Sequence, residues 1–285
     1  MLKWRVGDVT ITKILESEED PFDGSAMLMP AAKPDLVRQI NWLRPSHADD
    51  RGWIRLSFHA FVVDTPTKRI LVDTCVGADK KRGIPALDNL KSPFLDNLKQ
   101  AGFSQNSIDT VVCTHLHIDH VGWNTMLVDG KWVPTFPRAR FLMETAEFAH
   151  WRSQEEDAVH RQVFVDSVAP VFEAGLVELV SSDHRICDEV RLVPTPGHTR
   201  GHVSVEIKSR GEEALVTGDM VHHPCQFAHP NWAAAFDFDA AQSTRTREEV
   251  FARLAGRPVL VIGTHFMSPT AGRLVRDGDA YRLTD

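Results

Sequence analysis

The sequence predicts a mixed fold (α/β or α+β class) in which two mixed β-sheets pack face to face and helices flank them. Short runs rich in β-branched residues dominate the chain, and helical patterns interrupt them without strict alternation. Hydrophobic residues make up 42% of the 285 residues, which provides enough apolar material for a sizeable core. A single doubly wound parallel sheet fits this irregular order less well.

The N-terminal part of the chain predicts one strand followed by an irregular arm. Asp8–Glu16 alternates apolar and polar residues, as a half-buried strand does. Residues 17–50 are rich in Pro, Met and charge and show no strong period, so we expect an arm with short helices. We treat 1–285 as a single domain, with 1–54 as the N-terminal arm or cap and 55–270 as the core that carries the site.

The core is expected to begin with a hairpin and a helix. Leu56–Val63 and Arg69–Asp73 are strand-like, and Pro66-Thr67-Lys68 between them is typical of a turn. Residues 86–101 carry leucines near helical spacing, and Pro93 marks either a break in this helix or its start.

Short strands and two further helical stretches complete the predicted order. Strands are expected at Val111–Thr114, Phe141–Met143, Leu192–Val193, Val203–Ile207, Ala214–Thr217 and Val259–Ile262. Residues 145–172 have a helical pattern that Pro170 divides. Thr246–Leu254 is a second helix, ended by Gly256 and Pro258.

Charge and composition exclude two kinds of partner. The net charge of −7 argues against a nucleic-acid surface, which needs a basic patch. No apolar run approaches the ~18 residues of a transmembrane helix, so we expect no membrane partner. The four cysteines form no CxxC pair and the N-terminus lacks a signal-peptide pattern, so we expect a reduced, cytoplasmic protein.

Four candidate metal ligands lie within six residues: His115, His117, Asp119 and His120. Imidazole and carboxylate groups are preferred ligands of zinc and similar metals. In a loop that follows a strand, His115 and His117 can serve one ion while Asp119 and His120 serve another. Four ligands so close together cannot easily converge on one ion. The spacing therefore predicts two divalent metal ions, with zinc as the first choice and manganese, cobalt or iron as alternatives.

Three further candidate ligands each come directly after a predicted strand. They are His198, Asp219 and His265, and a glycine precedes each one closely. Glycine permits a tight bend and close backbone approach at such positions. Strand ends can hold ligands rigidly, so we expect these three side chains to join the first four.

Together these motifs resemble the metallo-β-lactamase superfamily. The matching elements are His115-x-His117-x-Asp119-His120, Gly197-His198-Thr199, Thr217-Gly218-Asp219 and Gly263-Thr264-His265. The resemblance covers roughly residues 55–270 and implies an αβ/βα sandwich. It also implies two metal sites. His115, His117 and His198 would hold one ion, Asp119, His120 and His265 would hold the other, and Asp219 would bridge both.

Within the superfamily, the chain is most similar to the branch of N-acyl-homoserine lactonases, 4-pyridoxolactonase and methyl parathion hydrolase. The supporting stretches are Ile70–Thr74, His120–Asn124 and Gly218–His223. True metallo-β-lactamases usually lack the aspartate that this chain has at Asp219. The resemblance implies that a hydroxide bridging two metals opens a lactone or cleaves an ester. Alternatives are a phosphotriesterase, a β-lactamase-like amidase, and a mononuclear iron persulfide dioxygenase.

The candidate catalytic residues are Asp119, Asp219 and His222. Asp219 would fix the metal spacing and accept a proton. His222 stands three residues after Asp219, where the lactonases carry a tyrosine, so it is the candidate for orienting the substrate or protonating the leaving group, with His223 second. His202 is expected to play a structural or supporting role.

Substrate contacts are predicted at three residues. Trp123 and Phe266 come close after ligands in the chain, and His223 follows His222. Because no cluster of Lys or Arg lies near the motifs, a small neutral or weakly polar lactone or ester fits best. The arm of residues 17–50 is a candidate contact for a homodimer.

Overall fold

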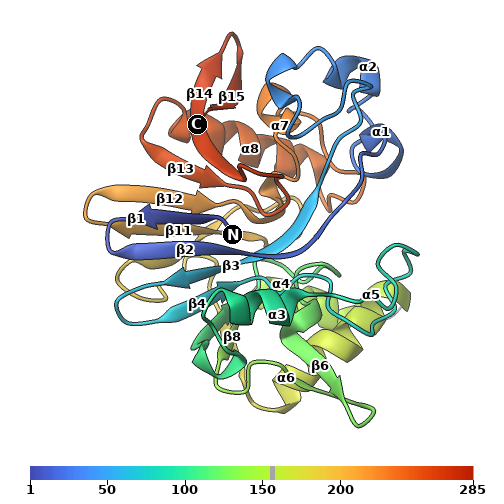
Figure 1. The fold of residues 1–285 in the computed structure, drawn as a ribbon, viewed down its shortest axis with the longest axis vertical. Coiled ribbons are helices and arrows are strands. Elements are labelled where there is room, and N and C mark those ends of the chain that lie inside the picture. Colours follow the sequence, from blue (N-terminus) through green and yellow to red (C-terminus); the bar gives the residue numbers. More distant parts are fainter. Residues whose placement is uncertain (155–157, 285) are drawn as a thin grey trace.

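Two β-sheets packed face to face form the centre of the molecule (Figure 1). The computed structural model describes residues 1–154 and 158–284. One sheet has seven strands in the order β1-β2-β3-β4-β5-β8-β9, and the other has six in the order β10 to β15. Valine, isoleucine and leucine side chains from both sheets meet in one buried cluster between them. The predicted two-sheet sandwich is confirmed.

The seven-stranded sheet is mixed. Its strands are β1 (Lys3–Val6), β2 (Val9–Glu18), β3 (Ser57–Asp64), β4 (Arg69–Val72), β5 (Thr110–Val112), β8 (Arg140–Glu144) and β9 (Val177–Val180). The first four pair antiparallel, and β4, β5, β8 and β9 pair in parallel. β3 and β4 form the predicted hairpin.

The six-stranded sheet is antiparallel except for one pair. Its strands are β10 (Val190–Pro194), β11 (Val203–Ser209), β12 (Glu212–Val216), β13 (Val259–Ile262), β14 (Ala271–Asp277) and β15 (Ala280–Thr284). β12 and β13 run parallel, so their carboxyl ends lie at the same edge. A separate hairpin joins β6 (Thr125–Val128) and β7 (Lys131–Pro134).

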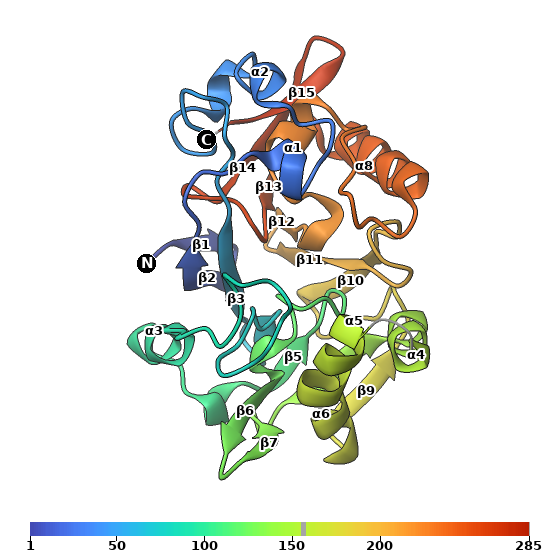
Figure 2. The ribbon, with the colours of Figure 1, turned by 90° about the vertical axis from the view of Figure 1, so that its right-hand side faces the viewer.

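Helices cover the outer face of each sheet (Figure 2). The helices α3 (Phe94–Gln100), α4 (Thr145–Ser153), α5 (Ala158–Val163) and α6 (Ala169–Glu173) pack against the seven-stranded sheet. On the six-stranded sheet, α8 (Ala240–Leu254) buries Val250, Phe251 and Leu254. These helices and sheets produce an αβ/βα layer order.

The N-terminal arm folds onto the C-terminal half of the chain. It contains the short helices α1 (Gly24–Met27) and α2 (Pro34–Val37), as predicted, and Figure 1 shows both near α7 (Cys225–Ala228). Its apolar residues, such as Met29 and Leu43, are buried in a cluster with Trp232. Both sheets extend beyond residues 55–270, because β1 and β2 precede that segment and β14 and β15 follow it.

Two predicted helices have different bounds in the structure. Of the helix expected within 86–101, residues 86–92 are not helical, and α3 begins at Phe94, which confirms the alternative that Pro93 marks its start. The helix predicted from Thr246 begins earlier, at Ala240, where the Asp239 side chain accepts a hydrogen bond from Gln242 N.

The helical stretch predicted over 145–172 is divided into α4, α5, a π-helical turn η4 (Phe164–Val168) and α6. Pro170 stands in the first turn of α6, and residues 155–157 lie outside the described residues. No described helix has both the length and the apolar character needed to cross a membrane.

Candidate metal centre

All seven predicted ligands lie on loops that leave the ends of strands. The loop after β5 carries His115, His117, Asp119 and His120, and the ends of β10, β12 and β13 lead to His198, Asp219 and His265. Each strand is pinned in a sheet, so its loop starts from a fixed point. The structure thus brings together side chains from two sheets that are up to 150 residues apart in the chain, since His120 shares one ligand group with His115 and another with His265.

The turn at Gly218 shows how tightly these loops approach one another. Gly218 has a φ of +55°, and a Cβ atom there would stand 2.6 Å from His202 Nε2. That histidine accepts a hydrogen bond of 2.8 Å from the backbone N–H of Asp219. A side chain at position 218 would therefore displace the contact that positions Asp219, and the predicted supporting role of His202 agrees with this geometry.

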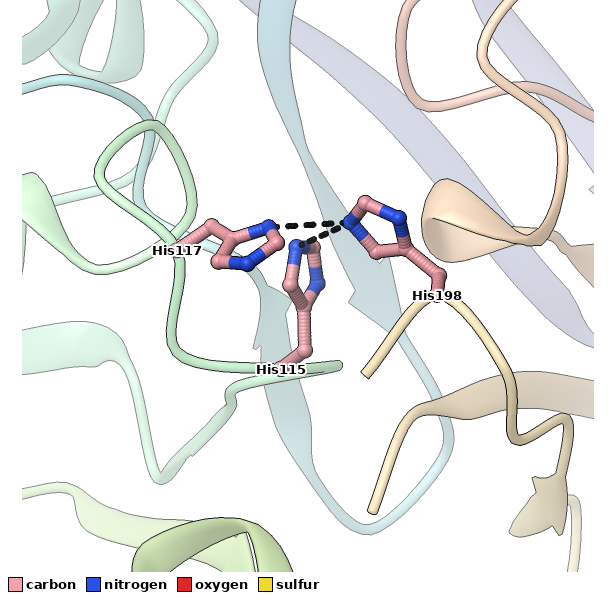
Figure 3. Close-up of side chains that lie close together, drawn as sticks. All are labelled: His115, His117 and His198. Atoms are coloured by element: carbon pink, nitrogen blue, oxygen red, sulfur yellow. Dashed lines mark hydrogen bonds between the residues drawn. The ribbon is translucent and has the colours of Figure 1, made fainter. Parts of the chain in front are cut away.

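One group of candidate ligands consists of His115, His117 and His198 (Figure 3). His198 Nε2 lies 3.2 Å from His115 Nε2 and 2.9 Å from His117 Nδ1. The three rings come from two different loops and converge on one point, and all three belong to buried or nearly buried residues. A single ion at that point would be within reach of three nitrogens.

The second group consists of Asp119, His120 and His265. His120 Nε2 and His265 Nε2 are 3.3 Å apart. The carboxylate oxygens of Asp119 lie 3.7 Å from His120 Nε2 and 3.5 Å from His265 Nε2. Asp119 is the most exposed of these side chains at 18%, so this group faces the solvent side.

The carboxylate of Asp219 lies between the two groups. Its Oδ1 is 3.1 Å from His265 Nε2, and its Oδ2 is 3.2 Å from His120 Nε2. The same Oδ2 is 3.6 Å from His198 Nε2 and 3.8 Å from His115 Nε2. Asp219 is thus the carboxylate that both groups can share.

The hydrogen bonds behind two of the rings determine which nitrogen carries the proton. His198 Nδ1 lies 2.8 Å from a carboxylate oxygen of Asp237, so it is the N–H donor. His120 Nδ1 lies 2.9 Å from Asp73 Oδ2 and donates in the same way. In a neutral imidazole the other nitrogen is then a bare lone pair, and in both residues it points into the cluster.

His115 and His265 follow the same rule. His265 Nδ1 lies 3.3 Å from the carbonyl oxygen of Ser57, which can only accept. Thr114 Oγ1 donates to Asp73, so it accepts from His115 Nδ1 at 3.1 Å. In the neutral form of these rings, the bare Nε2 atoms face one another in two pairs, His115 with His198 at 3.2 Å and His120 with His265 at 3.3 Å, an arrangement that a cation stabilises.

Burial and charge shift the pKa values of these residues in opposite directions. Burial, reinforced by the neighbouring imidazoles, holds the pKa of His115 and of His117 well below the ordinary value, so both are neutral and able to bind a metal. Burial would also lower the pKa of His120 and of His265, but the carboxylates of Asp219 and Asp119 outweigh it and raise both. Positive charge is therefore favoured beside Asp219.

The donor set and its spacing fit divalent metals of the zinc type. A tetrahedral zinc ion with Zn–N bonds of about 2.0–2.1 Å places its ligand atoms about 3.3 Å apart. The nitrogen pairs at 2.9, 3.2 and 3.3 Å match such edges. Asp219 Oδ1 is buried and has no hydrogen-bond partner among the described residues, as expected for an oxygen placed to bind a cation.

Comparisons with known proteins agree with this geometry. The family model of the metallo-beta-lactamase superfamily matches residues 56–265. The chain belongs to this superfamily. It is therefore an enzyme of a metallo-hydrolase superfamily, with a cluster of histidines and aspartates suited to metal binding.

Relatives within the superfamily include lactonases. An N-acyl homoserine lactonase of Bacillus sp is 26% identical over 170 residues, which are 58% of this chain and 59% of that protein. The chain thus matches less than two thirds of that relative's length. The hydrolase AbOPH has a similar structure, with a TM-score of 0.80, 24% identity, and coverage of 99% of this chain and 95% of that one. The dizinc quorum-quenching lactonase AidC gives a TM-score of 0.78 at 19% identity, with coverage of 99% and 96%.

A cavity of about 520 Å³ opens beside the second ligand group. Most of its wall is apolar, and its polar part contains carboxylates and two imidazoles. The lining residues are Glu18, Glu19, Asp20, Phe22, Met27, Leu28, Leu56, Phe58, Ile84, Ala86, Leu87, Ile118, Asp119, His222 and His265. Two of the segments that contribute to this wall, residues 18–28 of the arm and residues 84–87, carry no sequence signal that connects them with the site.

His222 lies where the cavity meets the cluster. Its Nε2 is 3.2 Å from Asp219 Oδ2, and neither ring nitrogen has a hydrogen-bond partner among the described residues. The side chain is only 2% exposed. Phe236, which is 46% exposed, packs edge-on against the rings of His222 and His198 from outside the cluster.

The three predicted substrate-binding residues do not line this cavity. Trp123 is buried, stacks on Phe94, and donates its indole N–H to Glu16. His223 donates from Nε2 to the carbonyl oxygen of His47, and its Nδ1 accepts a hydrogen bond from the backbone N–H of Cys225. Phe266 is fully buried against Phe227. The chain turns each of these side chains into the core, so we do not propose them as substrate contacts.

Two supporting residues were missed by the sequence analysis. Asp73 has a φ of +59° directly after β4 and accepts from Thr114 N, Thr114 Oγ1 and His120 Nδ1. Asp237 accepts from His198 and lies in the loop before α8. A carboxylate directly after a buried strand was a usable signal for Asp73. No local signal marks Asp237.

Proposed function

We propose that this chain hydrolyses small neutral lactones or carboxylic esters that carry an apolar acyl or aryl group. The reaction would take place at a centre of two divalent metal ions, with zinc as the first choice. One observation carries the proposal: the Asp219 carboxylate is within reach of two histidine groups, and two members of the second group, Asp119 and His265, line a largely apolar cavity. The lactonase relative supports the choice of substrate class.

The proposed ligands are His115, His117 and His198 for one ion and Asp119, His120 and His265 for the other, with Asp219 shared. When bound, such ions supply Lewis-acid polarisation of the carbonyl and lower the pKa of water at the centre. No serine or cysteine nucleophile is needed. The cysteines support this, because burial raises the pKa of Cys75 and Cys113 and keeps both as thiols.

The protein's own groups would bind the substrate and manage the proton. The apolar wall formed by Phe58, Leu56 and Leu87 would receive the acyl or aryl arm and exclude water from the reacting carbonyl. The carboxylate of Asp219 would accept a proton from the attacking water. His222 Nε2, 3.2 Å from Asp219 Oδ2, would take up this proton and pass it to the leaving oxygen.

The carboxylates at the cavity support a neutral substrate. Glu18, Glu19, Asp20 and Asp119 line it, and none of its described lining residues is lysine or arginine. Anionic phosphate monoesters and dicarboxylates would meet repulsion on entry. An uncharged lactone would not.

The test combines metal analysis, a substrate panel and one variant. We expect two divalent ions per chain, and faster turnover of N-acyl homoserine lactones and aryl esters than of penicillins or phosphotriesters. His222→Ala should keep both ions and lower kcat about 10²- to 10⁴-fold. His184→Ala, a histidine between β9 and β10, serves as the matched control with unchanged kcat.

Three results would reject parts of this proposal. One iron per chain with persulfide oxidation would replace it with dioxygenase chemistry. Penicillins or phosphotriesters turned over faster than lactones would reject the substrate class. Unchanged kcat in His222→Ala would remove that residue from the mechanism.

A further inference from the structure

A buried glutamate joins the two loops that carry the first ligand group. Glu147 lies in the first turn of α4 and is 1% exposed. Its Oε1 accepts from Leu116 N at 3.1 Å, and its Oε2 accepts from Gly201 N at 2.9 Å. Leu116 stands between His115 and His117 in the sequence, so one carboxylate holds the backbone of both loops.

The second loop continues directly from this contact to the centre. Gly201 lies between His198 and His202, and His202 Nε2 accepts the backbone N–H of Asp219 at 2.8 Å. A Cβ atom at position 201 would stand 2.6 Å from Glu147 N. The loop that carries His198 therefore runs against α4 at a distance that only glycine permits, so we expect a change at Glu147 to shift this loop.

The same carboxylate also positions an aromatic wall beside His117. Glu147 Oε1 accepts the indole N–H of Trp151 at 2.6 Å. The Trp151 ring lies edge-on to His117, with centroids 5.4 Å apart, and stacks on His160 at 4.4 Å. Three donors from three segments thus converge on one buried carboxylate, the arrangement that gives charge-assisted hydrogen bonds their strength.

The second ligand group has separate supports. Asp73 orients His120, and the Ser57 carbonyl orients His265. Among the described residues, Glu147 makes no hydrogen bond to either of these histidines or to Asp119. The two halves of the centre can therefore be perturbed one at a time.

We propose that Glu147 is a positioning residue for the His115, His117 and His198 group, and that it sets the metal affinity of this group alone. The inference rests on the proposed metal centre. Supporting carboxylates of ligand histidines typically change metal affinity 10- to 100-fold, and Glu147 acts in the same way through the backbone of two ligand loops.

The experiment measures metal affinity in single-group backgrounds. His265→Ala leaves the first group intact, and His198→Ala leaves the second. Zn²⁺ or Co²⁺ is titrated against a competing chelator in each background, with and without Glu147→Gln. The amide keeps one acceptor oxygen but presents an NH₂ group to a backbone N–H. We expect the dissociation constant to rise 10- to 100-fold in the His265→Ala background and less than about threefold in the His198→Ala background.

Glu16→Gln is the matched control. Glu16 is equally buried and accepts from Val76 N, Gly77 N and Trp123 Nε1, but from neither of the two loops. It should leave the first group's affinity within about threefold.

Equal weakening in both backgrounds would overturn the inference, since it indicates general loosening, and so would unchanged affinity in the first. If the unmodified chain binds two ions but opens no lactone, the proposed function fails while this measurement still decides on Glu147.

Discussion

Asp166 lies at the centre of a buried ion cluster behind one wall of the cavity. Arg82 Nη1 lies 3.1 and 3.0 Å from its two carboxylate oxygens, and Lys80 Nζ lies 3.7 Å from Oδ1. All three side chains are at most 1% exposed. Lys80 and Arg82 begin the segment that carries Ile84 and Leu87 to the cavity, so this cluster anchors that wall.

Asp166→Asn removes the only carboxylate that the described residues place against both cations. Breaking a buried ion pair by removing one partner costs about 3–5 kcal/mol. Burial lowers the pKa of Lys80 to about 7, against the opposing effect of Asp166, so the variant can shed the Lys80 proton and leave Arg82 as the uncompensated charge. We therefore expect the lower end of the range, about 3 kcal/mol. At about 2–4 °C per kcal/mol, the melting temperature should fall by about 6–12 °C.

Calorimetry or circular dichroism measures the melting temperature, and steady-state kinetics on a lactone with a long acyl chain measures KM. KM should rise because the wall at Ile84 and Leu87 loses its anchor. Asp188→Asn is the control, because Asp188 and its partner Arg185 have side chains that are 92% and 66% exposed. Such a pair contributes at most about 1 kcal/mol. If Asp166→Asn melts no lower than Asp188→Asn, the reasoning from burial is refuted.

Two further predictions concern pH and charge. Burial lowers the pKa of His223 to about 3 and of His47 to about 4, so both stay neutral in the folded protein while the unfolded chain binds protons below about pH 6.5. The unfolding free energy should thus fall by about 1.4 kcal/mol per pH unit for each histidine as the pH is lowered from 6 to 4. Urea unfolding at several pH values measures this dependence, and in His223→Gln the unfolding free energy should change by about 1.4 kcal/mol per pH unit less than in the unmodified chain. The same pH dependence in both proteins would contradict the prediction. Glu18, Glu19 and Asp20 line the cavity, and replacing them by their amides removes negative charge that repels an anionic substrate. At low salt, kcat/KM for a carboxylate-bearing aryl ester should rise about three- to fivefold relative to kcat/KM for its neutral analogue. An increase that persists in 1 M salt would exclude an electrostatic origin.

The clustering of the seven candidate ligands could be predicted because its signal is local. His115, His117, Asp119 and His120 follow a β-branched strand within six residues, and His198, Asp219 and His265 each follow a strand and a glycine. Strand ends are determined by short-range patterns, so the positions of these residues follow once the strands are assigned.

Two further hairpins carry a local signal in the sequence. Asp129-Gly130 joins β6 to β7, with φ values of +49° and +75°. Asp-Gly at such a position is a strong indication of a tight hairpin turn. Asp277-Gly278 at the end of β14 precedes β15 in the same way.

Side-chain direction could not be predicted from neighbours in the chain. Trp123 was expected at the substrate because it lies three residues after His120, but the turn Gly122–Asn124 directs it into the core. Leu87 was expected on a helix because of its spacing. It instead lies in a loop and faces the cavity. Both outcomes depend on packing between segments that are distant in sequence.

The motif alone does not determine which ring nitrogen of each candidate ligand faces the cluster, because this depends on the hydrogen bond that the other nitrogen makes. His117 faces the cluster through Nδ1, whereas His115, His120, His198 and His265 face it through Nε2. For the last four, the choice is made by acceptors on Thr114, Asp73, Asp237 and Ser57. Of these acceptors, only Thr114 is adjacent to its histidine in the chain. The motif shows which side chains are present, but the position of the proton on three of these rings, His120, His198 and His265, is set by residues distant in the chain. A substitution at Asp73 or Asp237 can therefore weaken the centre without changing any ligand.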